Sequence, residues 1–181
     1  MRTIFIAAWH NNAKTYPWSL SRDNGAAANW TTEFAVVNPI LDSVIRTWIP
    51  WFRLVKVPVW LNLNQRVKYI NSNSRDGDVC IEFHLDSAPN ADGCTTFYFT
   101  GSTYAQAKAT TFQQEYTRVS GIRWRGVKGD TTSRFGRLGF IRDTKPLALL
   151  VELGFITSTK DIATIQKYGA AAIIAGIKKI I

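Results

Sequence analysis

Val79-Cys-Ile-Glu-Phe-His-Leu-Asp-Ser-Ala88 is the stretch that decides the fold of this chain. Its apolar residues alternate with polar or small ones from Val79 to Asp86, which is the period-two pattern of a β-strand. The pattern stops at the cluster Ser-Ala-Pro-Asn over residues 87–90, which does not continue a strand ladder. His84 is therefore expected near the carboxyl end of a strand, where open α/β sheets place their sites.

Strand and helix patterns alternate along the rest of the chain. Residues 1–8 form an apolar first strand, and 146–156 form a strand so continuously apolar that both of its faces must be covered. Further strands are expected at 55–61, 95–100 and 140–143, and helices at 31–50, 61–71, 101–119 and from 159 onward. We expect α/β architecture in one domain spanning 1–181, with a twisted, mostly parallel or mixed β-sheet flanked by helices on both faces.

The composition indicates a globular protein that is attracted to polyanions. The 181 residues are 46% hydrophobic and include seven tryptophans, while the formal net charge is +9. Dense Lys/Arg tracts, zinc-finger spacing and an RNA-binding aromatic signature are all missing from the sequence, so nucleic acid is not the expected partner. An anionic cell-wall polymer or outer-membrane surface fits the charge equally well.

The sequence shows neither a transmembrane segment nor a secretion signal. Apolar runs are shorter than a bilayer crossing needs, and the first residues lack the pattern of a signal peptide. We therefore expect a monomer made in the cytoplasm. The segment 170–181 is interpreted as a helix packed on the sheet rather than a membrane-disrupting amphipathic helix.

Several other features admit two interpretations. The aromatic residues Trp48, Trp51, Phe52 and Trp60 are most simply core or packing surface, with an exposed platform for sugars as the alternative. The basic stretch 123–134 is expected to be a loop, either the wall of a cleft or a solvated surface. Cys80 and Cys94 are too few for a disulfide framework, and whether they pair depends on geometry.

Two histidines and one misplaced carboxylate are the candidates for chemistry. His10 follows the apolar run 4–9, and His84 stands near the end of the deciding strand, so both belong at strand ends. Glu152 lies inside the most apolar strand, where a carboxylate is costly unless it is paired, protonated or near a cation. We interpret the two imidazoles as parts of a metal site, and Glu152 as either a buried structural partner or a general base beside the metal.

Two blocks of the chain resemble the zinc N-acetylmuramoyl-L-alanine amidases of the Amidase_3 type, a family of bacterial cell-separation enzymes and phage endolysins. The blocks are Phe-His-Leu-Asp-Ser-Ala at 83–88 and Leu-Val-Glu-Leu-Gly-Phe-Ile-Thr at 150–157. The order His10, Glu33, His84, Glu152 is similar to that of the family, as are the segments 61–71 and 136–143.

The resemblance implies both a site and a reaction. His10, Glu33 and His84 would bind Zn²⁺ and leave one coordination position for water, as in hydrolytic zinc sites. Glu152 would act as the catalytic acid and base. The substrate would be peptidoglycan, cleaved at the amide between N-acetylmuramic acid and L-alanine. A chain of this size without further modules suggests a phage or prophage endolysin, which reaches the wall at lysis.

The sequence departs from the family pattern around the first metal ligand. The family usually has Gly-His-Gly-Gly there, whereas this chain has Trp9-His10-Asn11-Asn12. Trp9 would either crowd the metal or form a wall for sugar or peptide, and Asn12 is a candidate for contact with the substrate. Glu82 lies two residues before His84 on the same face of the strand, so it would orient the imidazole, touch substrate or pair with an arginine.

Three other functions compete with the amidase. A zinc peptidase could cut within the peptidoglycan stem peptide. A non-catalytic cell-wall-binding protein would result if Trp9 spoiled the site. A basic nucleic-acid binder would not need His84 at all.

Overall fold

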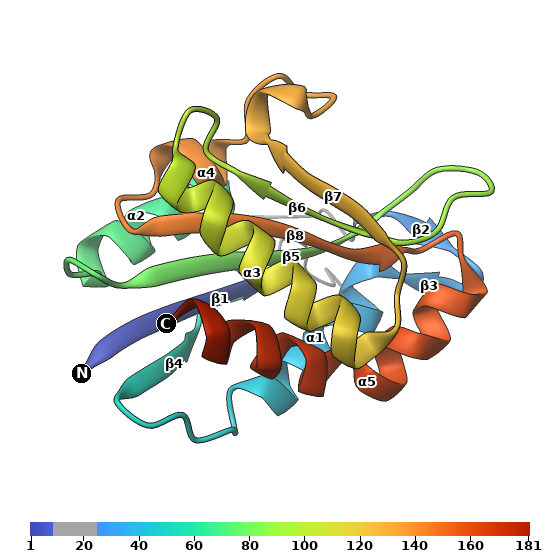
Figure 1. The fold of residues 1–181 in the computed structure, drawn as a ribbon, viewed down its shortest axis with the longest axis horizontal. Helices are drawn as coiled ribbons and strands as arrows, with labels where there is room; N and C mark the ends of the chain where they lie inside the picture. Colours follow the sequence, from blue (N-terminus) through green and yellow to red (C-terminus); the bar gives the residue numbers. More distant parts are fainter. Residues whose placement is uncertain (9–24) are drawn as a thin grey trace.

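The chain forms a mixed, mostly parallel sheet whose strands run in the order β4-β1-β5-β8-β6-β7 (Figure 1). The computed structural model describes residues 1–8 and 25–181. Strands β4, β1, β5 and β8 are mutually parallel, while β6 runs antiparallel to β8 and β7 runs parallel to β6. The strands span Arg2–Ala8 (β1), Phe52–Lys56 (β4), Val79–Asp86 (β5), Cys94–Tyr98 (β6), Trp124–Gly129 (β7) and Leu147–Phe155 (β8).

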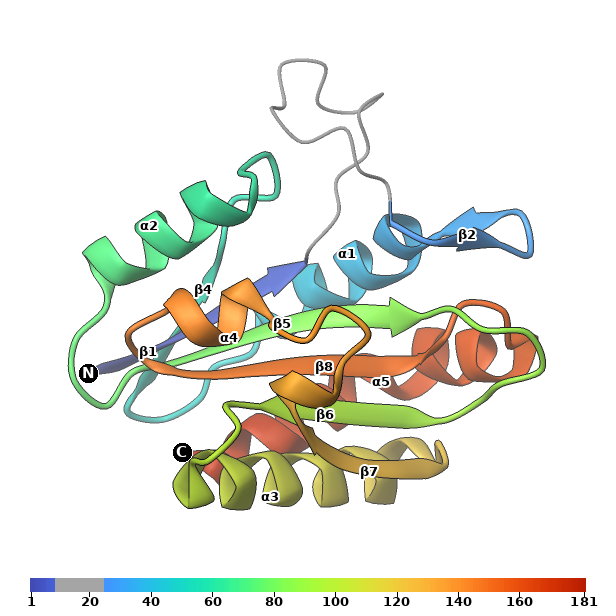
Figure 2. The same cartoon turned by 90° about the horizontal axis from the view of Figure 1, so that it is seen from above.

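Helices cover both faces of this sheet, which gives three layers (Figure 2). The hydrophobic cluster on one face joins the sheet to α1, α3 and α5, and a smaller cluster on the other face joins it to α2 and α4. The helices span Glu33–Val44 (α1), Leu63–Asn73 (α2), Thr103–Ser120 (α3), Gly139–Asp143 (α4) and Thr159–Ile180 (α5). A two-stranded hairpin of β2 (Ala27–Ala28) and β3 (Thr31–Thr32) precedes α1, and a short 3₁₀ helix, η1 (Asp130–Thr132), follows β7. The expected single α/β domain is confirmed.

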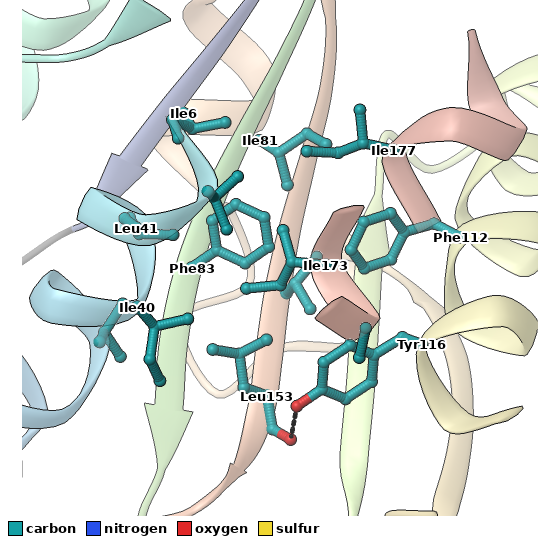
Figure 3. Close-up of a cluster of buried hydrophobic side chains, with 14 of the residues drawn as sticks. Ile6, Ile40, Leu41, Ile81, Phe83, Phe112, Tyr116, Leu153, Ile173 and Ile177 are labelled. Atoms are coloured by element: carbon teal, nitrogen blue, oxygen red, sulfur yellow. Dashed lines mark hydrogen bonds between the residues drawn. The ribbon is translucent and has the colours of Figure 1, made fainter. Parts of the chain in front are cut away.

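The alternation along β5 divides its side chains between the two clusters. Ile81 and Phe83 belong to the larger cluster, where Phe112 of α3 and Ile173 of α5 also lie (Figure 3). Cys80 belongs to the smaller cluster on the α2 side. Because side chains two apart on a strand share a face, Glu82 and His84 also point to the α2 side. The candidate chemistry therefore lies on the face of the sheet opposite the main core.

Hydroxyl side chains cap the first turns of three of the helices. Thr32 caps α1, Ser102 caps α3 and Ser158 caps α5, each by accepting a hydrogen bond from the backbone N–H three residues later. The predicted strand at 146–156 is confirmed as β8, which is buried on both faces. The last helix is also confirmed as packed, because Ile165, Ile173 and Ile177 lie in the main core.

Three element predictions are wrong in type or position. The predicted strand at 140–143 is part of helix α4, because a stretch of four residues is too short for its pattern to distinguish a helical turn from a strand. The predicted basic loop at 123–134 contains β7, which pairs with β6. The strand expected at 55–61 is β4 at Phe52–Lys56. It ends before Pro58, which has no N–H for a ladder.

The simpler interpretation of the aromatic residues after α1 holds for Phe52, which packs against the main core, but is wrong for Trp48 and Trp51. The helix ends at Val44 rather than at Pro50, and the chain turns before β4. Trp48 is 79% exposed and Trp51 is 84% exposed. Since α1 has twelve residues, this turn lies roughly 18 Å along the helix axis from Glu33.

The two cysteines are free and buried on opposite faces of the sheet. Cys80 lies in the smaller hydrophobic cluster and Cys94 in the larger one, so they are not paired. None of the helices within residues 1–8 and 25–181 combines the length and the apolar character that crossing a membrane requires.

A buried ion pair fastens α4 to the loops that follow β6 and β7. Asp130 is fully buried, and its two carboxylate oxygens accept hydrogen bonds from Arg142 Nε at 2.5 Å and Nη2 at 2.9 Å. The backbone N–H of Thr100 donates a third, at 3.0 Å. Burial alone raises the pKa of Asp130, but these hydrogen bonds outweigh it and lower the pKa from 3.8 to about 2.

The Asp130–Arg142 pair should therefore stabilise the fold above about pH 4 and lose its effect as the pH falls from about 4 to 2. Stability falls on acidification because the carboxyl of Asp130 takes up a proton at a higher pH in the unfolded chain than in the folded protein. We expect Asp130→Asn to lower the free energy of unfolding at pH 7 by about 2 kcal/mol. The variant should also flatten the acid limb of a plot of stability against pH, measured by denaturant unfolding.

Asp92→Asn is the matched control, because Asp92 pairs with Arg123 at the exposed surface. Exposed pairs contribute less than about 1 kcal/mol, so this change should leave both the stability and the acid limb nearly as in the parent protein. Equal effects of the two substitutions would contradict the account of Asp130.

Candidate active site

His84 lies between two carboxylates near the carboxyl end of β5. Its Nδ1 is 2.9 Å from Glu33 Oε1, and its Nε2 is 3.3 Å from Glu82 Oε2. The residue is only 9% exposed. Both ring nitrogens therefore face acidic groups, which fixes the plane of the imidazole.

Glu33 reaches His84 from the first turn of α1. Thr32 caps this helix, and a carboxylate in the first turn also interacts favourably with the helix dipole. Glu33 is 3% exposed, and its Oε1 accepts a hydrogen bond from the backbone N–H of Leu85 at 3.1 Å. The start of α1 is thus joined to the end of β5 through a buried carboxylate.

Glu82 is held by an arginine from the opposite side. It is 0% exposed, and its Oε1 accepts a hydrogen bond from Arg66 Nη1 at 3.0 Å. Arg66 is itself 1% exposed and also donates to the carbonyls of Leu61, at 2.8 Å, and Ala8, at 3.1 Å. Helix α2 therefore ties the end of β1 to the carboxylate beside His84. Such full burial leaves Glu82 no surface for substrate.

Glu152 lies beside His84 on the neighbouring strand. The two residues are register partners in the parallel pairing of β5 and β8, where strands are spaced about 4.8 Å apart. On its other side, Glu152 is paired with Thr95 of β6. Its Oε2 is buried and has no hydrogen-bond partner among the described residues.

The carboxyl end of β8 is held against the start of α5 by a close approach at Gly154. A Cβ on this residue would lie 2.9 Å from Ile165 Cδ1 and 3.0 Å from Asp161 Cβ. Asp161 accepts a hydrogen bond from the backbone N–H of Phe155 at 3.0 Å. The glycine two residues after Glu152 thus lets the last helix pack tightly against the strand that carries the candidate catalytic group.

The clustering of acids around one imidazole changes the proton affinities of the site. Burial lowers the pKa of His84, but hydrogen bonds to Glu33 and Glu82 outweigh it and raise that pKa well above its usual value. Burial raises the pKa of Glu152 to about 8; the charge of His84 opposes this shift, and the nearby carboxylates add to it. Glu152 therefore both holds and releases a proton close to neutral pH.

The contact between Glu33 and His84 fits two neighbouring ligands of one cation. A carboxylate oxygen and an imidazole nitrogen each about 2.0–2.1 Å from zinc would be roughly 3.3 Å apart in a tetrahedral site. The observed 2.9 Å needs only a small separation to reach that spacing. The residues outside 9–24 contain no group of three or more His, Cys, Asp and Glu side chains arranged to hold a metal, so a cation bound by Glu33 and His84 would need a further ligand.

The structure brings together Glu33, His84, Glu82 and Glu152 from the set that the sequence analysis selects. His10, Trp9 and Asn12 lie outside the described residues. Arg66 is a residue of the site that was not predicted from the sequence. A signal for it was present, because an arginine three residues after Leu63 and four before Ile70 lies on the apolar face of its helix.

The family model for N-acetylmuramoyl-L-alanine amidases (Amidase_3) matches residues 53–181. The matched part includes Glu82, His84 and Glu152, whereas Glu33 and His10 precede it. No curated protein matches the chain.

Solved structures of amidases share the fold over nearly their full length. The catalytic domain of CwlV, an N-acetylmuramoyl-L-alanine amidase from Bacillus (Paenibacillus) polymyxa var. colistinus, is 24% identical with a TM-score of 0.78, covering 98% of this chain and 96% of that one. The catalytic domain of the CD27L endolysin targeting Clostridia difficile is 19% identical with a TM-score of 0.76, covering 99% and 97%. The CwlD amidase from Clostridioides difficile, solved with the GerS lipoprotein, is 21% identical with a TM-score of 0.75, covering 99% and 98%.

Removing Arg66 should strongly destabilise the protein, because Glu82 would remain buried without its ion pair. We expect Arg66→Leu to lower the free energy of unfolding by about 3 kcal/mol or more. Adding Glu82→Gln to that variant should recover part of the loss. Denaturant unfolding of the single and double variants measures both effects.

Arg118→Leu provides the control, since Arg118 pairs with Glu115 on the exposed side of α3. Its loss should cost less than about 1 kcal/mol. If the double variant were no more stable than Arg66→Leu alone, the unpaired carboxylate of Glu82 would not be the cause of the destabilisation.

Proposed function

Because the chain belongs to the Amidase_3 family of N-acetylmuramoyl-L-alanine amidases, we propose that it is a zinc hydrolase of peptidoglycan. It would cleave the amide between the lactyl group of N-acetylmuramic acid and the L-alanine of the stem peptide. The family membership supports the class of reaction. The roles of individual residues rest on the geometry of the candidate active site.

The observation that carries the proposal is the convergence of three groups from three elements. Glu33 from α1 and His84 from β5 are in contact, and Glu152 from β8 is the register partner of His84. Their arrangement supports Glu33 and His84 as zinc ligands, with His10 as the third ligand suggested by sequence. A zinc ion held there would activate water and polarise the scissile carbonyl.

Glu152 is the residue we assign to proton transfer. Its Oε2 has no hydrogen-bond partner among the described residues, and a pKa of about 8 places both the loss and the uptake of its proton within about one pH unit of neutrality. The same proton could then pass to the amine of the departing L-alanine. Glu82, which faces the other ring nitrogen at 3.3 Å, would hold the imidazole of His84 in a fixed plane.

The basic character of the chain supports a cell wall as the place of action. A net charge of +9 attracts the protein to anionic wall polymers, and added salt should weaken this attraction. Within the proposal, the protein acts as a monomeric phage or prophage endolysin released at lysis. The structural likeness to the CD27L endolysin catalytic domain supports such a fold for this role.

Glu152→Gln should abolish most of the activity without unfolding the protein. The amide keeps the size of the side chain but cannot accept the proton, so we expect the rate to fall by about a hundredfold to ten-thousandfold. The measurement is the release of new free N-termini on L-alanine from purified peptidoglycan. Glu115→Gln on the outer side of α3 is the matched control and should retain full activity.

The products separate the proposal from its rivals. New N-termini on residues other than L-alanine would indicate a peptidase that cuts within the stem. Binding to peptidoglycan without any cleavage, in protein loaded with zinc, would indicate a wall-binding protein. Full activity of Glu152→Gln would reject the assigned role of that residue.

A further inference from the structure

Trp30 is fully exposed at the tip of the β2–β3 hairpin. The hairpin pairs Ala28 with Thr31, so Asn29 and Trp30 form its two-residue turn. The exposed fraction of Trp30 is 107%, which means that the indole touches almost nothing within residues 1–8 and 25–181. An indole in this position buries no apolar surface, so it does not stabilise the fold through the hydrophobic effect.

The backbone at this turn disfavours a tryptophan. Both turn residues have positive φ, 51° at Asn29 and 61° at Trp30, which is the signature of a type I′ turn. Such turns favour Asn-Gly, since a Cβ in the left-handed region costs free energy. Asn29 suits its position and donates a hydrogen bond from Nδ2 to the carbonyl of Ile156 at 2.9 Å. Glycine at position 30 would make this turn more stable, so the stability of the fold does not account for the tryptophan there.

The turn lies next to the candidate active site. Trp30 precedes Glu33 by three residues, so their Cα atoms are at most about 11 Å apart. The bond from Asn29 to Ile156 fastens the hairpin to the residue after β8. Figure 2 shows the hairpin at the end of the sheet where β5 ends, beside the start of α1.

We propose that Trp30 is a stacking platform for a sugar ring of the glycan strand. This inference rests on the proposed function, because the bond to be cleaved joins a sugar directly to a peptide. The flat apolar face of an indole complements the C–H face of a pyranose, and its N–H can donate to a hydroxyl or acetamido oxygen. A sugar bound at Trp30 would hold the glycan beside Glu33.

The surroundings of Trp30 favour a neutral ligand over an anionic surface. The segment 25–33 contains no lysine or arginine, and its only charged residue is Glu33. Trp51 provides the contrast, because it also has a positive φ, of 68°, and is 84% exposed, but lies near Arg46 and Arg53 at the opposite end of α1. The two tryptophans therefore share backbone strain and exposure and differ in their distance from the site.

Trp30→Gly and Trp51→Gly form a matched pair for the test. Both should leave the protein at least as stable as the parent in thermal unfolding, because glycine relieves the strained φ. Only Trp30→Gly should weaken binding to purified glycan strands that lack stem peptides, by about tenfold, and raise KM on intact peptidoglycan with little change in kcat. Trp30→Phe, which keeps a flat ring, should restore most of the binding.

The peptide-free glycan keeps this test separate from the proposed reaction. Unchanged glycan binding and KM in Trp30→Gly, in an enzyme that cleaves peptidoglycan, would overturn the platform and leave the amidase intact. If Trp30→Gly lost glycan binding but the parent protein did not cleave peptidoglycan, the proposed amidase function would be wrong and the role of Trp30 in binding sugar would stand. If Trp30→Gly instead lost only its adsorption to vesicles of anionic phospholipid, the tryptophan would serve a membrane surface and the sugar proposal would be wrong.

Discussion

The imidazole of His84 is held between Glu33 and Glu82, and the rest of the site depends on how those two acids are themselves held. A buried carboxylate needs hydrogen bonds or a counter-ion to be stable. Glu33 obtains a backbone N–H from Leu85, and Glu82 obtains the guanidinium of Arg66. Helices α1 and α2 thus support one histidine from opposite sides. The ring can then present one nitrogen to a cation while the other faces Glu82 Oε2, 3.3 Å away.

The parallel arrangement of β1, β5 and β8 explains why this chemistry collects at one edge of the sheet. Parallel strands end together, so His84 and Glu152 become neighbours although 68 residues separate them in sequence. The end of β1, which leads into the segment with His10, is joined to the same place by the bond from Arg66 to Ala8. The main hydrophobic core lies on the other face, so the polar site does not interrupt it.

Strong periodicity was enough to predict the architecture and to single out His84 and Glu152 as candidates for chemistry. The alternation in β5 and the continuous apolar character of β8 identified these strands correctly, because each pattern runs over eight or nine residues. Short segments such as 140–143 and 55–61 failed, since few residues carry the pattern and tertiary pairing decides their state. Arg66 was missed although its position on the apolar face of α2 was a signal in the sequence. Trp30 was missed because strain at an exposed turn is a property of the three-dimensional structure. The roles of Glu33, His84 and Glu152 came from family resemblance rather than from pattern.

The proposed hydrolysis requires a cation at the place where Glu33 meets His84. The number of zinc ions bound per chain is the most direct measure of that cation. After loading with zinc and removal of the excess, the parent protein should retain about one zinc per chain, the number that one such site holds. His84→Ala should retain almost none, while Glu115→Ala on the far surface should match the parent. A folded parent protein that keeps no zinc, or a His84→Ala variant that keeps as much as the parent, would contradict the account.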